Sequence, residues 1–132
     1  PICNEHRILL EQPVTITGAG GSITALPFLQ DHGDVVSLGF RFGDLAYSSD
    51  LRDIPAHSLP GLTGLQVWIV DALRYRPHPT HFSLAETLSW IKRLKPARAI
   101  LTNMHSDLDY AELRATLPSD IEPAYDGMRV TM

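Results

Sequence analysis

Hydrophobic and polar residues alternate along the first part of the chain in the manner of β-strands. Apolar side chains occupy every second position in Val14–Ile16 and again in Ile23–Phe28, and the glycine-rich segment Gly18–Gly21 separates the two runs. Alternation with a period of two, interrupted by glycines, is typical of a β-hairpin. No helical pattern follows the glycines, so a plain turn is favoured over a phosphate-binding loop.

The pattern of the remaining chain predicts further strands interleaved with two helices. The strands are expected at Ser37–Phe42, Leu45–Ser48, Val67–Val70, Ala99–Thr102 and Met128–Thr131. The first helix starts with a capping box at Ser83–Glu86 and keeps apolar residues at helical spacing as far as Leu94. The second is capped by Asp109 and continues to Leu117. A sheet backed by helices satisfies this order, and the predicted fold class is α/β (α+β).

The composition is that of a folded domain without a basic surface. The 132 residues fit one domain or part of one, and 44% hydrophobic with 20% charged residues argues against disorder. The net charge of −4 and the scattered lysines and arginines make nucleic acid an unexpected partner. The one basic cluster, Lys92 to Arg98, falls at the predicted end of the first helix, where positive charge complements the helix dipole.

The sequence also bears on the cellular compartment of the protein and on whether the chain is complete. Cys3 is the single cysteine, which excludes an intrachain disulfide and fits a reducing compartment. No apolar run approaches the roughly 18–20 residues of a membrane-spanning helix, and no signal peptide is visible, so we expect a cytoplasmic protein without a membrane partner. The segment Pro1–Asn4 has neither an initiator methionine nor a capping signal. We therefore expect the chain to be a piece of a longer protein.

Histidines and acidic residues, with one asparagine, follow four of the predicted strands. They are Asp31, His32 and Asp34 after the first, Asp50 after the second, His78 and His81 after the third, and Asn103, His105 and Asp107 after the fourth. Strand ends hold side chains rigidly while the loops leave room for a ligand. Imidazole and carboxylate groups bind zinc, manganese or iron, so the joint placement predicts a metal site. Taken singly, each residue also fits an ordinary turn or helix cap, which is the role expected for His6 and His57.

Other common chemistries find little support. The chain has no Gly-x-Ser-x-Gly sequence for a serine nucleophile and no Cys-x-x-Cys pair for a structural zinc. Cys3 lies in the terminal segment, where a catalytic cysteine is not expected. Metal-assisted hydrolysis is thus the leading chemistry.

Several segments together resemble the metallo-β-lactamase superfamily. They are Leu26–Gly33, Leu38–Phe42, Ala46–Asp50, Trp68–Asp71 with the loop to His81, Ile100–His105 and Tyr125–Met128. Within that superfamily the chain is most similar to the phosphoribosyl 1,2-cyclic phosphate phosphodiesterase group, from about Pro13 to Met132. The resemblance implies an αββα sandwich of which residues 1–132 form a single partial domain, the C-terminal half. The signature His-x-His-x-Asp-His does not occur in this sequence, which implies that an N-terminal half is missing.

The resemblance also implies roles for individual residues. In the full-length protein two divalent metal ions, zinc or manganese, would be bound, with His32 on one ion and Asp50 bridging both. A carboxylate suits a bridge because it offers two oxygens. His81 matches a histidine proposed to protonate the leaving group, and imidazole titrates near neutral pH.

The last metal ligand and two further acids are assigned by position. The superfamily places a histidine where this chain has Asn103. His105 lies two residues further on, and in an extended segment it points to the same face, so the ligand role is carried to His105. Asp71 and Asp126 either orient ligating imidazoles or are strand-end turn residues.

These assignments predict hydrolysis of a cyclic phosphate or a phosphodiester, a small substrate, by the full-length protein. The 132 residues alone are expected to be inactive and to bind metal weakly. Apolar surface is expected where the missing half packs, which favours a homodimer. Two alternatives stay open: a metallo-hydrolase that acts on a lactone or thioester, since fold does not fix substrate, and a non-catalytic module, which Asn103 supports.

Overall fold

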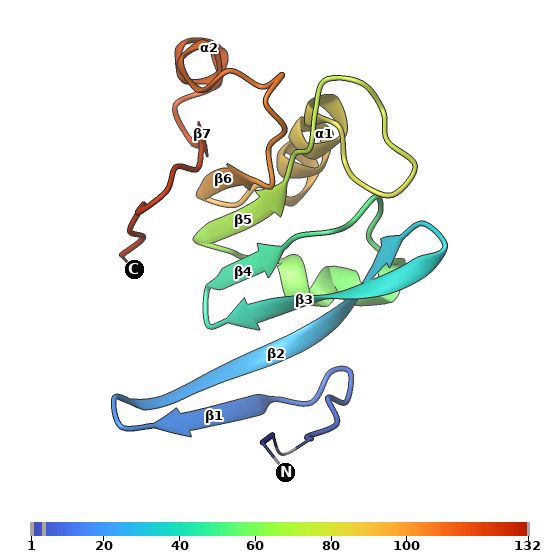
Figure 1. Ribbon diagram of the computed structural model, residues 1–132, viewed down its shortest axis with the longest axis vertical. Helices are drawn as coiled ribbons and strands as arrows, with labels where there is room; N and C mark the ends of the chain where they lie inside the picture. Colours follow the sequence, from blue (N-terminus) through green and yellow to red (C-terminus); the bar gives the residue numbers. More distant parts are fainter. Residues whose placement is uncertain (1, 4, 132) are drawn as a thin grey trace.

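A single mixed sheet organises the computed structural model, which describes residues 2–3 and 5–131 (Figure 1). Its strands are β1 (Val14–Gly18), β2 (Gly21–His32), β3 (Val35–Phe42), β4 (Leu45–Ser48), β5 (Val67–Asp71), β6 (Arg98–Thr102) and β7 (Ile121–Pro123), and they neighbour one another in chain order. Pairing is antiparallel from β1 to β4 and parallel from β4 to β7. Strands β2, β4, β5, β6 and β7 therefore run in one direction, and their carboxyl ends meet at one edge of the sheet.

The two predicted helices form with the predicted caps. Helix α1 (Leu84–Leu94) has the complete capping box of Ser83 and Glu86, and α2 (Tyr110–Thr116) starts at Asp109, whose side chain accepts from the amide of Glu112. A 3₁₀ helix, η1 (Ala56–Leu62), lies between β4 and β5. In the described part of the chain, no helix has the length and apolar character needed to cross a bilayer.

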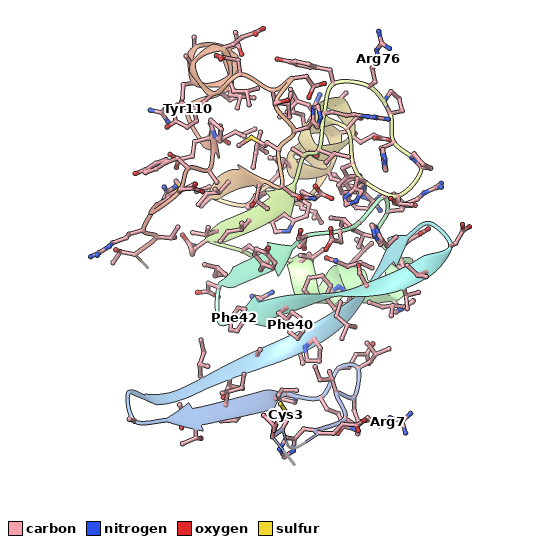
Figure 2. All side chains as sticks on the ribbon, viewed as in Figure 1. Cys3, Arg7, Phe40, Phe42, Arg76 and Tyr110 are labelled. Carbon is pink, nitrogen blue, oxygen red and sulfur yellow. The ribbon has the colours of Figure 1, made fainter. Side chains whose placement is uncertain are left out.

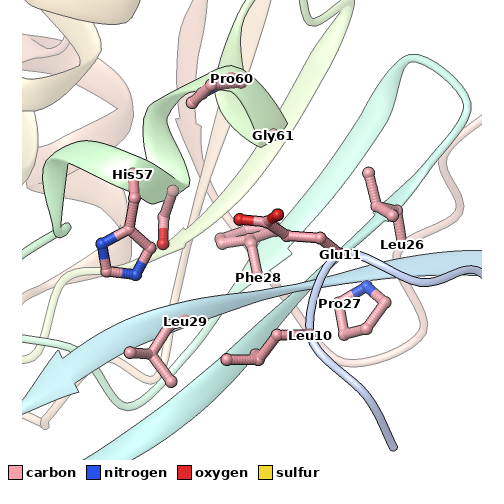
Figure 3. A pocket seen from close by; sticks show the side chains of 10 residues that line it. Leu10, Glu11, Leu26, Pro27, Phe28, Leu29, His57, Pro60 and Gly61 are labelled. Carbon is pink, nitrogen blue, oxygen red and sulfur yellow. The ribbon is translucent and has the colours of Figure 1, made fainter.

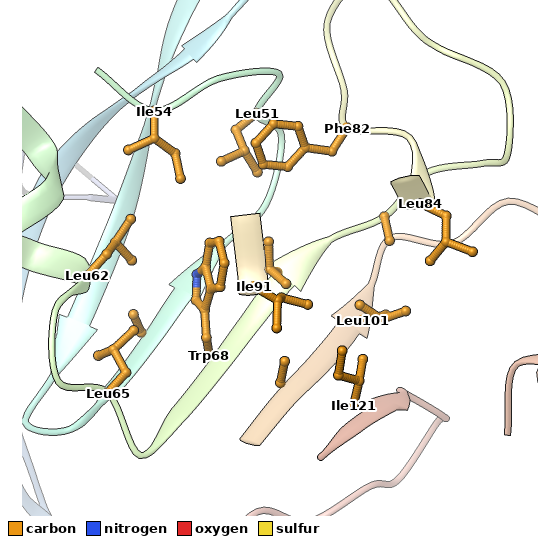
Figure 4. Packing of buried hydrophobic residues seen from close by; sticks show 14 of the residues in the cluster. Leu51, Ile54, Leu62, Leu65, Trp68, Phe82, Leu84, Ile91, Leu101 and Ile121 are labelled. Atoms are coloured by element: carbon orange, nitrogen blue, oxygen red, sulfur yellow. The ribbon is translucent and has the colours of Figure 1, made fainter. Parts of the chain in front are cut away.

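The core lies between the sheet and the helices α1 and η1 (Figures 1 and 4). Trp68 of β5 and Leu101 of β6 are fully buried, and Ile91 of α1 packs against the same cluster. The indole Nε1 of Trp68 donates to Ser48 Oγ at 3.0 Å, so this buried donor is satisfied. A rigid centre of this kind fixes the strand ends on which the candidate site is built.

The sheet face turned away from Phe28 carries a row of apolar side chains. Phe28 packs on η1 at Gly61, whereas Phe40, Tyr47 and Ile69 pair side by side on the opposite face. Figure 2 shows Phe40 on this open side, and Tyr47 is 40% exposed. No helix of the described chain covers this row, although Phe40 and Ile69 are themselves half-buried.

Two expectations about the strands need correction. The second strand of the hairpin does not end at Phe28 but continues to His32, because its pairing with β3 extends to His32 and Val35. The strand predicted at Met128–Thr131 does not form. The last strand is β7 instead, which gains its hydrogen bonds from the free edge of β6 despite containing proline, so tertiary pairing overrides the local pattern.

Candidate metal centre

Three of the predicted site residues converge at the carboxyl edge of the sheet. His32 ends β2, Asp50 follows β4, and His81 lies in the loop between β5 and α1. Each offers one ligand atom, and these atoms all lie within 4.8 Å of one another. The imidazole rings of His32 and His81 meet edge to face with centroids 4.7 Å apart. The two histidines are half-buried and Asp50 is exposed, so the group faces a solvent-accessible edge.

Backbone hydrogen bonds between three loops bring these residues together. The amide of Asp31 donates to the carbonyl of Asp53 at 3.0 Å, and the amide of Arg52 donates back to Asp31 at 2.8 Å. The amide of Phe82 donates to the carbonyl of Leu51 at 2.8 Å. The end of β2, the loop after β4 and the loop before α1 are thus joined next to His32, Asp50 and His81.

The backbone of Asp50 is held from both sides. Ser37 Oγ donates to the carbonyl of Asp50 at 2.6 Å, and Gln30 Nε2 donates to the carbonyl of Ser49 at 2.9 Å. Asp50 has a φ of 55°, in the left-handed region that aspartate tolerates better than most residues. Its Oδ1 lies 3.9 Å from Nδ1 of His81. The carboxylate is therefore placed by the backbone and by Gln30 and Ser37.

Both imidazoles are oriented through Nδ1. Nδ1 of His32 lies 2.7 Å from the carbonyl oxygen of Thr80, and since a carbonyl can only accept, Nδ1 carries the proton. Nδ1 of His81 lies 2.6 Å from Oδ2 of Asp71. Among the described residues Nε2 of neither ring has a hydrogen-bond partner, so this nitrogen can bind a ligand. Histidines that bind metals are commonly oriented in this way by a carbonyl or carboxylate, so the donor set present here fits a divalent metal ion.

Asp71 is fully buried beneath His81. Burial raises the pKa of its carboxyl group above the ordinary value, and the hydrogen bonds and charge from His81, the amide of Asn103 and the backbone of Leu51 oppose that shift. Asn103 Nδ2 donates to Oδ1 of Asp71 at 3.2 Å. The structure places Asp71 in contact with the imidazole that the sequence assigned to proton transfer.

Asn103 and His105 lie differently from each other. Asn103 has a φ of 57°, and this left-handed residue ends the extended path of β6. The premise of an extended segment that points both side chains to one face is therefore wrong. Nδ1 of His105 lies 3.0 Å from Oδ1 of Asp107, its side chain is 62% exposed, and it is not part of the described ligand group. Its role as a metal ligand stays a prediction.

The other residues singled out in the sequence occupy separate places. Asp126 is exposed in the turn after β7, and its assigned role also stays a prediction. His6 is exposed, and His57 lines an apolar hollow of about 290 Å³ between the N-terminal segment, β2 and η1 (Figure 3). Sequence reasoning missed the orienting carbonyl of Thr80 and the supports Gln30 and Ser37. A backbone carbonyl leaves no signal in a sequence.

A glycine beside His32 gives a first test of this packing. Gly33 has a φ of 78°, and a Cβ there would lie 2.7 Å from Cγ2 of Thr80, the residue whose carbonyl orients His32. We expect Gly33→Ala to lower the free energy of unfolding by about 2–3 kcal/mol, through backbone strain and this collision. Gly43→Ala is the matched control, since Gly43 also has a positive φ, 58°, but a Cβ added there would meet no atom within 4 Å. Equal losses in urea denaturation would show that the contact with Thr80 is not tight.

Comparison with known proteins identifies the family and the fold of the chain. The β-lactamase superfamily domain matches residues 1–104. A crystal structure described as a new diphosphatase from the PhnP family is 33% identical, with a TM-score of 0.88 over 96% of this chain and 48% of that one. The Bacillus subtilis metallo-β-lactamase fold protein YhfI (16% identity, TM-score 0.70, 92% of this chain and 53% of that one) shares the fold. Zn²⁺-bound PqqB from Methylobacterium extorquens does so as well (13%, 0.66, 95% and 55%).

One curated relative is an octanoyltransferase from Porphyromonas gingivalis (strain ATCC BAA-308 / W83), 28% identical over 109 residues. The alignment covers 80% of this chain but 22% of that protein. The chain thus spans about a fifth of the length of this relative and about half the length of the solved structures. With most of its residues matched by the superfamily domain, the chain belongs to the β-lactamase superfamily and has the metallo-β-lactamase fold.

Proposed function

We propose that the protein containing this chain is a metal-dependent hydrolase of phosphodiester or cyclic phosphate bonds. The observation that carries the proposal is the convergence of His32, Asp50 and His81 within 4.8 Å, with Nδ1 of each imidazole already engaged. Membership of the β-lactamase superfamily supports metal-dependent hydrolysis. The 33% identical relative described as a diphosphatase supports a phosphorus-centred substrate over a lactone or thioester.

The residues of this chain divide the work of such a reaction. His32 and Asp50 would hold divalent metal ions, zinc or manganese. When bound, such ions neutralise phosphate charge and lower the pKa of a bound water. His81 would pass a proton from its imidazole to the oxygen of the leaving group. Asp71 beneath it accepts a hydrogen bond from Nδ1, which fixes the orientation of the ring.

We further propose that a preceding segment completes the centre and covers the open sheet face. Two observations support this: the solved relatives are about twice as long as the chain, and Phe40, Tyr47 and Ile69 form an apolar row on a sheet face that no helix of the described chain covers. Without that segment the same row would favour self-association into a homodimer. The 132 residues alone would then bind metal weakly and turn over no substrate.

The proposed function is tested by measuring how fast the metal-loaded protein hydrolyses three kinds of substrate: a phosphodiester, a lactone and a thioester. We expect hydrolysis of bis(p-nitrophenyl) phosphate, lost on removal of metal by a chelator and restored by zinc or manganese, with two metal ions per chain by elemental analysis. Lactone and thioester substrates should react at least about 10²-fold more slowly, because their trigonal carbonyl carries no anionic oxygen for the metal ions. Preferred turnover of either one would contradict the proposal. Inertness towards all three substrates would favour a non-catalytic module.

A further inference from the structure

A hollow lies beside the candidate metal centre, between the ends of β6 and β7. Because β7 runs parallel to β6, its carboxyl end reaches the same edge of the sheet as the other strand ends. The hollow has a volume of about 480 Å³ and is lined by Thr102–Met104 and Ala124–Met128. That volume lies in the roughly 300–1,000 Å³ range of small-molecule sites.

Asn103 joins this hollow to the reacting groups. It is one of the residues that line the hollow, and its Nδ2 lies 3.2 Å from Oδ1 of Asp71 and 3.4 Å from Nδ1 of His81. A substrate whose phosphorus lies beside His81 would therefore extend its non-reacting part past Asn103 and into the hollow.

The charge of the residues that line the hollow determines which chemical groups can bind there. None of the lining residues is lysine or arginine, and Asp126 contributes an exposed carboxylate. A second phosphate would be repelled there, whereas hydrogen-bond donors would be favoured. The hollow is therefore suited to an uncharged group that carries N–H donors.

An aromatic ring in the same wall is held in place. Tyr125 is 56% exposed, and its ring lies against the ring of Tyr110 at the start of α2, with centroids 6.2 Å apart and planes at 88°. The turn that carries it is closed by a hydrogen bond from the amide of Met128 to the carbonyl of Tyr125 at 3.0 Å, with Gly127 at a φ of 84°. An exposed ring in a closed turn offers a flat face for stacking.

We infer that this hollow binds the nucleobase of a nucleotide-type substrate, with Tyr125 stacking on the base and Asp126 accepting its N–H groups. The inference rests on the proposed phosphodiesterase function and specifies its substrate class. Stacking on an aromatic side chain suits a base because every base presents a flat π-face. The phosphoryl group then faces His81, and the base occupies the far end of the hollow.

Two substrates with the same leaving group test the inference in the full-length, metal-loaded protein. Thymidine 5′-(p-nitrophenyl phosphate) and methyl p-nitrophenyl phosphate both release p-nitrophenolate and differ in whether a base is present. We expect kcat/KM to be at least about 10-fold higher for the thymidine substrate. Tyr125→Ala should remove about 10-fold of that preference, mainly through KM, and leave the methyl substrate unchanged. Tyr125→Phe should keep the preference, since the ring remains, and Asp126→Asn should lower it in part.

Tyr75→Ala is the matched control, because Tyr75 is an exposed tyrosine outside the lining of the hollow. Equal kcat/KM values for the two substrates, or an equal loss for both in Tyr125→Ala, would overturn the inference while leaving the hydrolase intact. Failure of the wild type to cleave either substrate would count against the proposed function instead. In that case binding of thymidine 5′-monophosphate, measured by calorimetry in wild type and Tyr125→Ala, still decides: unchanged affinity in the variant refutes the base site.

Discussion

Asp50→Asn is expected to lower kcat/KM for bis(p-nitrophenyl) phosphate by at least about 10³-fold and to reduce the metal content of the protein. An amide lacks the negative charge that holds a divalent ion, and the metal centre contributes several kcal/mol of transition-state stabilisation, at about 1.4 kcal/mol for each factor of ten. Asparagine is the appropriate replacement, because Asp50 has a φ of 55° and asparagine tolerates the left-handed region equally well. The substitution therefore removes charge with little backbone strain.

Asp34→Asn is the control for this variant. Asp34 is an exposed acid in the turn after His32 and is not part of the ligand group. Its replacement by asparagine therefore removes the same charge close to the site without removing a ligand. Elemental analysis should show metal lost in Asp50→Asn and kept in Asp34→Asn. Full metal content together with full activity in Asp50→Asn would exclude Asp50 as a ligand.

The sequence predicted the parts of the site that depend on strand direction. His32 is the last residue of β2, Asp50 and His81 follow β4 and β5, and the pairing brings the ends of these three strands to one edge. The capping residues of α1 and α2 were also readable, because a cap is a local interaction between residues three positions apart. Patterns of this kind depend on residue type and spacing alone.

The rest depends on contacts between distant segments. The ring of His32 is oriented by the carbonyl of Thr80, 48 residues later in the chain, and any residue type supplies a carbonyl. The sequence does not show that Asn103 adopts the left-handed conformation, since asparagine is common in turns and in other loops alike. The sequence pattern therefore predicts an extended segment, and the expected direction of the His105 side chain is wrong. Strand β7 was missed because Ile121–Pro123 is short and contains proline, so its pairing with β6 supplies what the local pattern lacks.

Substrates with different leaving groups can show whether His81 donates a proton or binds a metal ion. His81 supplies one of the three clustered ligand atoms and also contacts Asp71, so its position suits both a metal ligand and a proton donor. We expect His81→Ala to lower kcat by about 10²–10⁴-fold for a diester with an alkoxide leaving group, which needs a proton in the transition state. Bis(p-nitrophenyl) phosphate should lose only a few-fold, because p-nitrophenolate leaves without protonation.

Metal analysis completes this test. A proton donor can be removed while the metal stays, so His81→Ala should keep its metal ions, and His57→Ala, an exposed histidine outside the ligand group, should match the wild type in every respect. If His81 is a ligand, both substrates should lose activity together and the metal content should fall. The ratio of the two rates thus reports proton transfer, since loss of a metal ion affects both leaving groups whereas loss of the acid affects the alkoxide alone.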